Sequence, residues 1–242
     1  MSTKKTLGKL AGDAIGMHDL PVIAADIIAG YRALPDLTGM VSDVLDELGI
    51  AGAIPASVLR PVDPKARLVG RALTVKNVAP KLSVAEAVAT GVSGLGEIEA
   101  HNLSQPGDVL VIQGVDQVSN LGGVSATIGH RQGQIGAVID GGARDVDESR
   151  EIGYGIWSRS VSPLTGKWRV QTVAVNKPVV ICGIPVNPGD LVLADEVGVC
   201  FIPRERAAQV LERVQRNAAA EAIRLAKVAA GAPVPDLMPK KR

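Results

Sequence analysis

The chain has 242 residues, of which 46% are hydrophobic, and this is enough for one large domain or two small ones with a substantial core. Its 26 Lys and Arg residues against 25 Asp and Glu residues give a formal net charge of +1, which argues against a surface built to cover a nucleic acid. One Phe, two Trp and two Tyr are also too few for an RNA reader that stacks bases, so nucleic acid is not an expected partner.

The cysteine and hydropathy patterns indicate the compartment. Cys182 and Cys200 each lie in an apolar run with neither C-x-x-C nor Cys/His spacing, so we expect buried, reduced thiols and no zinc site. The charged N-terminus is not followed by an apolar segment, and no window of about 18 uncharged apolar residues occurs. These patterns predict a cytoplasmic protein without a membrane span.

The first part of the chain has helical patterns. Residues 1–36 are predicted to form an N-terminal helical arm that ends near Pro35. The run L-T-G-M-V-S-D-V-L-D-E-L-G then predicts a short amphipathic helix, with Thr38 or Ser42 as its start and Gly49 as its stop.

Strand patterns and helix patterns alternate in the next part. The run R-A-L-T-V-K-N-V predicts a strand, and Ser83 with Glu86 three residues later forms a capping box for a helix that Gly91 closes. Two later segments share one local device, Q-P-G-D-V-L-V-I at 105–112 and N-P-G-D-L-V-L-A at 187–194. In each, a Pro-Gly turn leads through an Asp into a strand.

A βαβ unit is expected in the middle of the chain. The runs D-V-L-V-I-Q-G at 108–114 and I-G-A-V-I-D at 135–140 predict strands, and Ser119 or Asn120 is predicted to cap a helix between them that runs to about Gln132. A helix of about 12 residues rises roughly 18 Å, and a strand of about six residues returns roughly 20 Å. The chain therefore comes back to the level at which the helix began.

The handedness of such a unit brings chemically useful residues to one rim. In a right-handed crossover the helix start faces the ends of both strands, so Gly122, Gly123 and Val124 are expected to face the loop of Arg144 and Asp145. Free N–H groups at the helix start attract a carboxylate, Arg144 can clamp the same anion, and Asp145 can hold a hard divalent cation. The rim thus predicts a site for a small carboxylate beside a metal. The alternative is that Arg144 and Asp145 are loop charges that serve solubility or a salt bridge.

The last part of the chain predicts more strands and a final helix. From Trp157 onward, short β-branched runs separated by Gly, Pro and Asn suggest an antiparallel sheet layered on the parallel unit. Residues 206–242 are expected to form an Ala-rich helix with an exposed tail, and a projecting helix of this kind suits an oligomer contact. Residues 37–205 then make up the core of the protein.

One spacing in the chain is shared with a known enzyme family. Gly123 is followed after twenty residues by Arg144-Asp145 and then, after two more residues, by the acid Glu148. In this pattern, and in R-L-V-G-R-A-L-T-V, V-S-P-L-T-G and N-P-G-D-L-V-L-A-D-E-V-G-V-C-F-I-P, the chain resembles the 4-hydroxy-4-methyl-2-oxoglutarate and 4-carboxy-4-hydroxy-2-oxoadipate aldolases of the RraA-like superfamily. The resemblance covers about residues 37–203. It implies an α/β fold, a layered α/β/β sandwich of the swivelling-domain-like type with a central βαβ unit and flanking terminal helices.

The resemblance also implies an activity, a divalent-metal-dependent lyase of the class II pyruvate aldolase type. Such enzymes cleave 4-hydroxy-2-oxo acids, for example 4-hydroxy-4-methyl-2-oxoglutarate, to pyruvate, and decarboxylate oxaloacetate through the same enolate. The residue matches imply Mg²⁺ or Mn²⁺ held by water and Asp145, and a pyruvyl group held by Arg144. Main-chain amides at Gly123, Val124 and Ser125 would bind the carboxylate and keto group of this small 2-oxo acid. The resemblance further implies a homotrimer or homohexamer.

Gly123 departs from the family pattern. Active aldolases of the family usually carry an acid at this position, L-G-D where this chain has L-G-G, and that acid orients metal-bound water. Asp147, Glu148 or Glu196 of a neighbouring subunit are the candidates to replace it.

Two alternatives stay open at this point. One is an enzyme of the same superfamily that acts on another small hydroxy or keto acid, and the other is a non-enzymatic regulator that binds a ribonuclease. Retention of Arg144 and Asp145 favours chemistry over regulation. His18, His101 and His130 are scattered along the chain and are expected to be structural or exposed.

Overall fold

The computed structural model describes residues 4–237. Among these residues, nine strands form one mixed sheet and two more pair as a hairpin. The strands are β1 (Ala53–Pro55), β2 (Arg60–Pro61), β3 (Leu68–Val78), β4 (Asp108–Gln113), β5 (Gly136–Ala143), β6 (Gly155–Val161), β7 (Gln171–Val175), β8 (Val179–Ile181), β9 (Ile184–Val186), β10 (Leu191–Ala194) and β11 (Gly198–Ile202). The α-helices are α1 (Ala25–Arg32), α2 (Leu37–Glu47), α3 (Val84–Thr90), α4 (Ile98–Leu103), α5 (Gly123–Arg131), α6 (Val146–Glu151), α7 (Ala207–Ala229) and α8 (Val234–Leu237).

The main sheet has a parallel centre and antiparallel edges. Its order is β1-β11-β10-β3-β4-β5-β6-β2, and β3, β4, β5 and β6 run parallel to one another. One edge of the long strand β3 is shared, since residues 68–71 pair with β10 and residues 75–78 pair with β7. The expectation of a separate antiparallel sheet after Trp157 is therefore wrong for β7, β10 and β11, which extend the main sheet, and for β6, which is parallel to β5.

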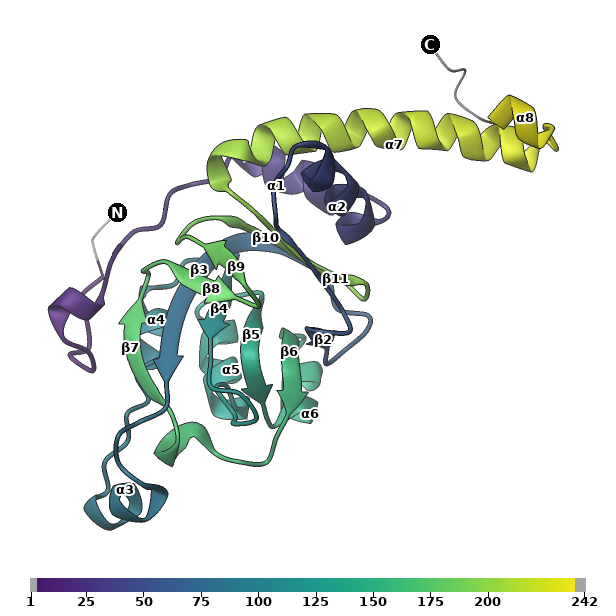
Figure 1. Cartoon of the computed structure of the whole chain (residues 1–242). Coiled ribbons are helices and arrows are strands. Elements are labelled where there is room, and N and C mark those ends of the chain that lie inside the picture. Colours follow the sequence, from purple (N-terminus) through teal and green to yellow (C-terminus); the bar gives the residue numbers. More distant parts are fainter. Residues whose placement is uncertain (1–3, 238–242) are drawn as a thin grey trace.

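Three layers are stacked in the body of the molecule (Figure 1). Helices α4, α5 and α6 cover one face of the parallel strands, and the β8–β9 hairpin covers the other face. Parallel strands covered on both faces have continuous apolar runs, and the residues of β4 from Val109 to Ile112 are all fully buried. This arrangement of helices, sheet and hairpin confirms the expected α/β/β class with its central βαβ unit.

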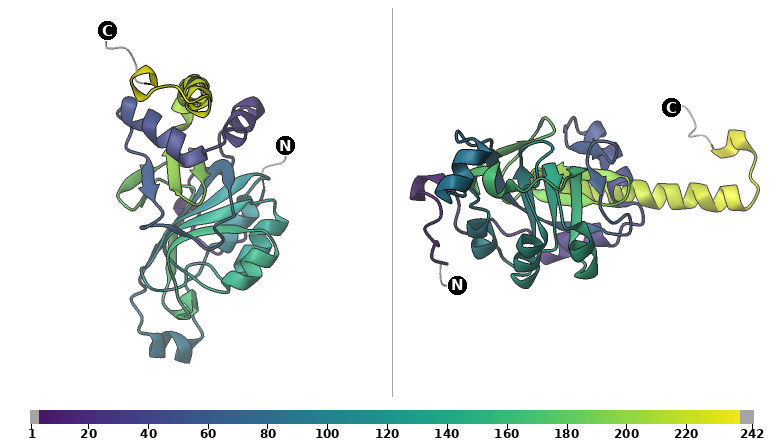
Figure 2. Two further views of the ribbon diagram at one scale, coloured as in Figure 1. Left: turned by 90° about the vertical axis from the view of Figure 1, so that its right-hand side faces the viewer. Right: turned by 90° about the horizontal axis from the view of Figure 1, so that it is seen from below.

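Helix α7 lies against α1 and α2 at one end of the sheet and then extends beyond the body (Figure 1, Figure 2). Tyr31 of α1 is fully buried there, and its hydroxyl donates a hydrogen bond to the Ala207 carbonyl at 2.8 Å. Val210 is buried in the same core, whereas Ile223 and Leu225 in the extension are more than half exposed. The long C-terminal helix is thus present as predicted, and the end of the predicted tail, 238–242, lies outside the described residues.

Several local signals act as the sequence predicts. The capping box of Ser83 and Glu86 starts α3, and Gly91 ends it with φ +68°. The two Pro-Gly turns are also alike, because Asp108 and Asp190 each accept a hydrogen bond at 2.7 Å from the N–H group three residues earlier. Local hydrogen bonding therefore explains where these elements begin and end.

The start of α2 differs from the prediction. Asp36, rather than Thr38 or Ser42, is the N-cap residue, and its carboxylate accepts a hydrogen bond from Gly39 N–H. The Thr38 hydroxyl is used elsewhere, because it donates to the Asp195 carboxylate at 2.6 Å. A carboxylate immediately before the helix is the better acceptor for its free N–H groups.

The expected burial of the cysteines is confirmed for Cys200, while Cys182 is half-buried. Both thiols are free, and burial raises the pKa of each to about 12, so they are protonated at neutral pH. In the described part of the chain, no helix combines the length and the apolar character needed to cross a membrane.

Candidate active site

Two loops meet at one rim of the parallel strands. Main-chain hydrogen bonds join the loop before α5 to the end of β5 and to the loop after it, from Asn120 N–H to the Gly142 carbonyl at 2.8 Å and from Arg144 N–H to the Leu121 carbonyl at 3.1 Å. Since β4 and β5 are parallel neighbours connected through α5, the rim is built as the βαβ geometry predicts. This pairing holds the start of α5 beside Arg144 and Asp145.

Neither Ser119 nor Asn120 caps α5, which begins at Gly123. The buried Asn120 amide instead donates to the carbonyls of Val115 and Val118, both at 2.8 Å, and accepts from Val115 N–H at 2.9 Å. The side chain that was predicted to cap the helix therefore stabilises the preceding loop. As a consequence, the N-cap position of α5 is Gly122, which has no side chain to accept from the first N–H groups of the helix.

The first turn of α5 presents main-chain donors. Gly123 N–H donates to the Asp145 carboxylate at 3.0 Å. The N–H groups of Val124 and Ser125 have no hydrogen-bond partner within residues 4–237. These donors lie at the positive end of the helix dipole, so they favour an anion.

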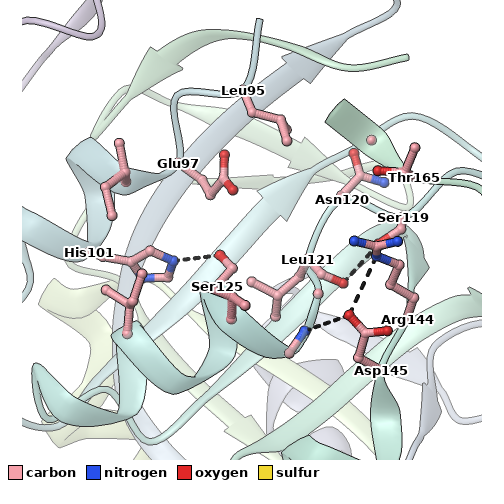
Figure 3. Close-up of a pocket in the computed structure, with 16 residues that line it drawn as sticks. Leu95, Glu97, His101, Ser119, Asn120, Leu121, Ser125, Arg144, Asp145 and Thr165 are labelled. Atoms are coloured by element: carbon pink, nitrogen blue, oxygen red, sulfur yellow. Dashed lines mark hydrogen bonds and ion pairs between the residues drawn. The ribbon is translucent and has the colours of Figure 1, made fainter. Parts of the chain in front are cut away.

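The donors face a cavity of about 200 Å³ (Figure 3). The residues predicted to bind substrate or metal all line it, namely Gly122, Gly123, Val124, Ser125, Arg144 and Asp145. Glu97 and His101 lie on the opposite side of the cavity from Arg144 and Asp145, with Ser125 between them. A water molecule takes up about 30 Å³ in the liquid, so the cavity has room for a small organic acid.

Asp145 is held in an uncommon backbone conformation. Its φ of 52° and ψ of 44° lie in the left-handed region, which Asp tolerates better than most residues with a Cβ atom. One of its carboxylate oxygens accepts the Gly123 hydrogen bond and lies 3.5 Å from Nε of Arg144. The Arg144 and Asp145 side chains are 41% and 39% exposed, so both are free to meet a ligand.

The Glu148 carboxylate occupies the space that a side chain at position 123 would enter. A Cβ atom added at Gly123 would overlap a Glu148 carboxylate oxygen and would lie 3.1 Å from the Asp145 Cβ atom. Asp147 is exposed and does not line the cavity, and Glu196 is exposed at the turn between β10 and β11. Of the three candidates considered for this role, Glu148 is the one beside position 123 within this chain.

Asp145 and Glu148 carry carboxylate oxygens, which are the ligands that Mg²⁺ and Mn²⁺ prefer. Mg²⁺ keeps several of its waters and binds through one or two carboxylates. The described residues contain no cluster of three or more His, Cys, Asp and Glu side chains that could enclose a metal. Two partly exposed carboxylates therefore fit a hydrated divalent cation better than a zinc ion in a closed site.

Sequence patterns do not single out His101, although it lines the same cavity. It is only 1% exposed, with Nε2 2.8 Å from the Ser125 hydroxyl and Nδ1 3.2 Å from the Gln134 side-chain oxygen. Burial lowers the pKa of His101 to about 4, against the effect of the Gln134 hydrogen bond, so the ring is neutral at pH 7. One sequence feature indicates that some side chain packs against this part of α5, without saying which. Gly129 lies four residues after Ser125 on the same face of the helix, and a glycine within a helix leaves room for a neighbouring side chain.

Glu97 is a half-buried acid that also lines the cavity. One of its carboxylate oxygens is buried and has no hydrogen-bond partner in the described part of the chain. Burial raises the pKa of Glu97, and a hydrogen bond from its own N–H offsets part of that rise. This side chain is also absent from the sequence-based site, because a lone Glu at the start of a short helix carries no recognisable spacing.

The family of the chain follows from a comparison with known sequences. The family model described as RraA-like (Aldolase/RraA) matches residues 38–201. The chain belongs to the RraA-like family. A relative from Halalkalibacterium halodurans, provisionally named as a 4-hydroxy-4-methyl-2-oxoglutarate aldolase, is 29% identical over 196 residues, which are 80% of this chain and 84% of the relative. A 4-hydroxy-4-methyl-2-oxoglutarate aldolase of Thermus thermophilus is 31% identical over 99 residues, which are 40% of this RraA-like chain and 60% of that protein.

Solved structures share the RraA-like fold. An uncharacterized protein from Pseudomonas syringae superposes with a TM-score of 0.74 at 28% identity, covering 90% of this chain and 98% of that one. RraAS2 of Streptomyces coelicolor, described as an unusual member of the RNase ES inhibitor RraA protein family, superposes with a TM-score of 0.69 at 25% identity, covering 85% and 97%. Since relatives carry both kinds of name, family membership confirms the fold and leaves the activity to the site.

Proposed function

We propose that this RraA-like protein is a divalent-metal-dependent carbon–carbon lyase. It releases pyruvate from a 4-hydroxy-2-oxo acid such as 4-hydroxy-4-methyl-2-oxoglutarate, and it decarboxylates oxaloacetate. The observation that carries the proposal is one small cavity lined by free main-chain N–H groups, Arg144 and Asp145, with the Glu148 carboxylate beside it. The relatives named as aldolases support the same reading.

The substrate end of the cavity suits a 2-oxo carboxylate. The N–H groups of Val124 and Ser125 are free to donate to its oxygens, at the positive end of the α5 dipole. Arg144 adds a planar set of N–H donors that pair with a carboxylate in two places. The 3.5 Å contact of Arg144 with Asp145 is long and partly exposed, so the guanidinium can turn toward a bound anion.

The metal end is formed by Asp145 and Glu148, which would hold Mg²⁺ or Mn²⁺ together with water. A cation bound there supplies Lewis-acid stabilisation for the negative charge that develops on the 2-keto oxygen. Asp145 is well suited to this role because its left-handed backbone and the Gly123 N–H group fix the direction of its carboxylate. Glu148 reaches the space left open by the glycine at position 123.

Release of pyruvate tests the proposal directly. The purified protein is supplied with oxaloacetate or 4-hydroxy-4-methyl-2-oxoglutarate, with Mg²⁺, with Mn²⁺ or with a chelator, and pyruvate is followed by a coupled lactate dehydrogenase assay. A blank with metal and no protein is needed because metal ions decarboxylate oxaloacetate on their own. We expect metal-dependent pyruvate from both substrates, and a loss of about a hundredfold or more in Asp145→Ala.

The matched control is Asp147→Ala, because Asp147 is an exposed acid two residues away that does not line the cavity. This variant should keep a rate close to that of the wild type. Pyruvate from oxaloacetate alone would indicate a superfamily member with another hydroxy or keto acid as its substrate. The lyase proposal fails if neither substrate gives metal-dependent pyruvate above the blank, or if Asp145→Ala is as active as Asp147→Ala.

A further inference from the structure

A chain of hydrogen bonds runs from the cavity into the core beneath α5. The Ser125 hydroxyl lies 2.8 Å from His101 Nε2, and His101 Nδ1 lies 3.2 Å from the Gln134 side-chain oxygen. The Tyr154 hydroxyl donates to the same Gln134 oxygen at 2.9 Å. Gln134 and Tyr154 are 3% and 2% exposed, so the chain begins at the cavity with Ser125 and ends in the protein interior.

The polarity of this chain follows from its inner end. Burial raises the pKa of Tyr154 far above its usual range, so its hydroxyl stays protonated and donates to Gln134. The Gln134 oxygen only accepts, so the proton of the neutral His101 ring is on Nδ1. Nε2 is then an acceptor, and the Ser125 hydroxyl must donate to it. This is the arrangement of a hydroxyl activated by a base, with the base oriented by a third group.

Helix α5 makes space for the chain. Gly129 lies inside the helix, where a glycine costs about 1 kcal/mol relative to alanine. A Cβ atom there would overlap the Gln134 side-chain oxygen and would lie 3.1 Å from His101 Nδ1. Because Gly129 has no side chain, the surface of α5 is uncovered at the point where His101 and Gln134 approach it.

Three other cavity groups are less suited to moving a proton at the reacting carbon, and Glu97 is the competing acid that the experiment below distinguishes from Ser125. The Arg144 guanidinium carries N–H donors and no acceptor atom, and Asp145 would hold the cation under the proposed function. The Ser119 hydroxyl is buried and donates to the Leu121 carbonyl at 2.9 Å. Ser125 is the cavity hydroxyl that is bonded to an imidazole.

We propose that the Ser125 hydroxyl is the catalytic proton-transfer group of this cavity, and that His101 and Gln134 are positioning residues that hold it in that role. This inference rests on the proposed lyase function and adds a residue to it. Ser125 is placed two residues beyond Gly123 in the first turn of α5, between the His101 side of the cavity and the side of Arg144 and Asp145 (Figure 3).

The proton balance of the reaction closes within this pair. Ser125 takes the proton of the substrate 4-hydroxyl group and passes its own proton to His101 Nε2. The bond between C3 and C4 breaks, the 4-oxygen forms a carbonyl, and the electron pair of the bond becomes that of the pyruvate enolate. C3 then takes a proton from the Ser125 hydroxyl, which recovers one from His101 Nε2. One proton has moved from the 4-hydroxyl to C3, and both residues are back in their starting states.

Exchange of the pyruvate methyl protons isolates this step, because it needs proton transfer at C3 and no cleavage of a carbon–carbon bond. Wild-type protein, Ser125→Ala, Ser125→Thr, Glu97→Gln and Thr127→Ala are incubated with pyruvate and Mg²⁺ in D₂O, and loss of the methyl signal is followed by proton NMR. Thr127→Ala is the matched control, since it removes an exposed hydroxyl of the same helix that does not line the cavity. Ser125→Thr keeps a hydroxyl at the site.

We expect Ser125→Ala to lose about a hundredfold in exchange rate while its KM for pyruvate stays within about threefold of the wild type. Thr127→Ala should exchange normally, and Ser125→Thr should retain a rate above that of Ser125→Ala. If the wild type and Ser125→Ala exchange equally, the inference is wrong and the lyase proposal is untouched. Loss of exchange in Glu97→Gln with normal exchange in Ser125→Ala would also overturn it. If the wild type shows no metal-dependent exchange, the proposed function and the inference fail together.

Discussion

Substitutions at Asp145 separate its effect on the backbone from its effect on a metal. The residue combines a left-handed conformation, φ 52°, with a carboxylate that accepts a hydrogen bond from Gly123 N–H at 3.0 Å. Asn keeps the tolerance for this conformation and an acceptor oxygen but lacks the charge. Gly keeps only the tolerance, and Ala keeps neither. The three variants therefore remove the features of Asp145 in different combinations.

The expected stabilities follow from these losses. Loss of the hydrogen bond costs about 1 kcal/mol, since water can replace part of it at a side chain that is 39% exposed. An Ala in the left-handed region costs about 1 kcal/mol more than the Asp. We expect Asn to be within about 1 kcal/mol of the wild type, Gly to lose about 1 kcal/mol and Ala about 2 kcal/mol. For a chain of this size these losses lower Tm by about 2–4 °C for Gly and about 4–8 °C for Ala.

Metal binding should follow a different order. Urea and thermal unfolding measured with a chelator present give the stabilities without a contribution from bound cation, and titration with Mn²⁺ followed by electron paramagnetic resonance gives the affinities. All three variants should lose most of the Mn²⁺ affinity because all three lack the charge of Asp145. Equal stability of the Ala and Gly variants would refute the backbone argument. Wild-type Mn²⁺ affinity in the Asn variant would refute the assignment of the carboxylate as a metal ligand.

Two more predictions concern groups that pack against α5. Gly123→Ala should displace the Glu148 carboxylate, which is the far end of a flexible, exposed side chain, at a cost below about 1 kcal/mol. A double-mutant cycle with Glu148→Ala should show a coupling of the same size, and additive effects would contradict the overlap. Burial lowers the pKa of His101 from 6.5 to about 4, so the unfolded chain binds more protons between these values, and stability should fall as the pH falls through this window. The loss of unfolding free energy approaches about 3 kcal/mol near pH 4. The unfolding free energy of His101→Gln should lack this pH-dependent component. An identical pH dependence in both proteins would show that His101 is not buried as a neutral ring.

The rim of the βαβ unit could be predicted because it depends on local patterns. Alternation of apolar runs and turns gives two strands with a helix between them, and the handedness of such units places Gly123 and Arg144 on the same rim. The helix start could not be placed from propensity, because Ser119 and Asn120 are good capping residues in isolation. In the structure the Asn120 side chain is taken by carbonyl and N–H groups of its own loop, and this competition is decided by tertiary packing.

The hydrogen-bonded chain at Ser125 could not be predicted for a different reason. Ser125, His101 and Gln134 come from separate elements, and no spacing along the sequence connects a lone His to a helical Ser 24 residues later. The pairing of β3 with two antiparallel strands has the same origin, because a buried apolar run does not specify its neighbours. In both cases the missing information lies in contacts between residues that are distant in the sequence.

The two glycines of α5 show how the site is supplied with functional groups from outside the helix. At Gly123 the Glu148 carboxylate enters from α6, and at Gly129 the Gln134 oxygen enters from the segment before β5. By sequence position the chain lacks the acid that the family resemblance implies at 123, whereas in the structure the Glu148 carboxylate, carried by α6, occupies the space beside that position. If the double-mutant cycle confirms this overlap, Gly123→Asp would place a third carboxylate beside Asp145 and Glu148 rather than restore a lost one. We therefore expect Gly123→Asp to weaken Mn²⁺ binding through like-charge crowding and a displaced Glu148, and Gly123→Asp combined with Glu148→Ala to bind Mn²⁺ more tightly than Gly123→Asp alone.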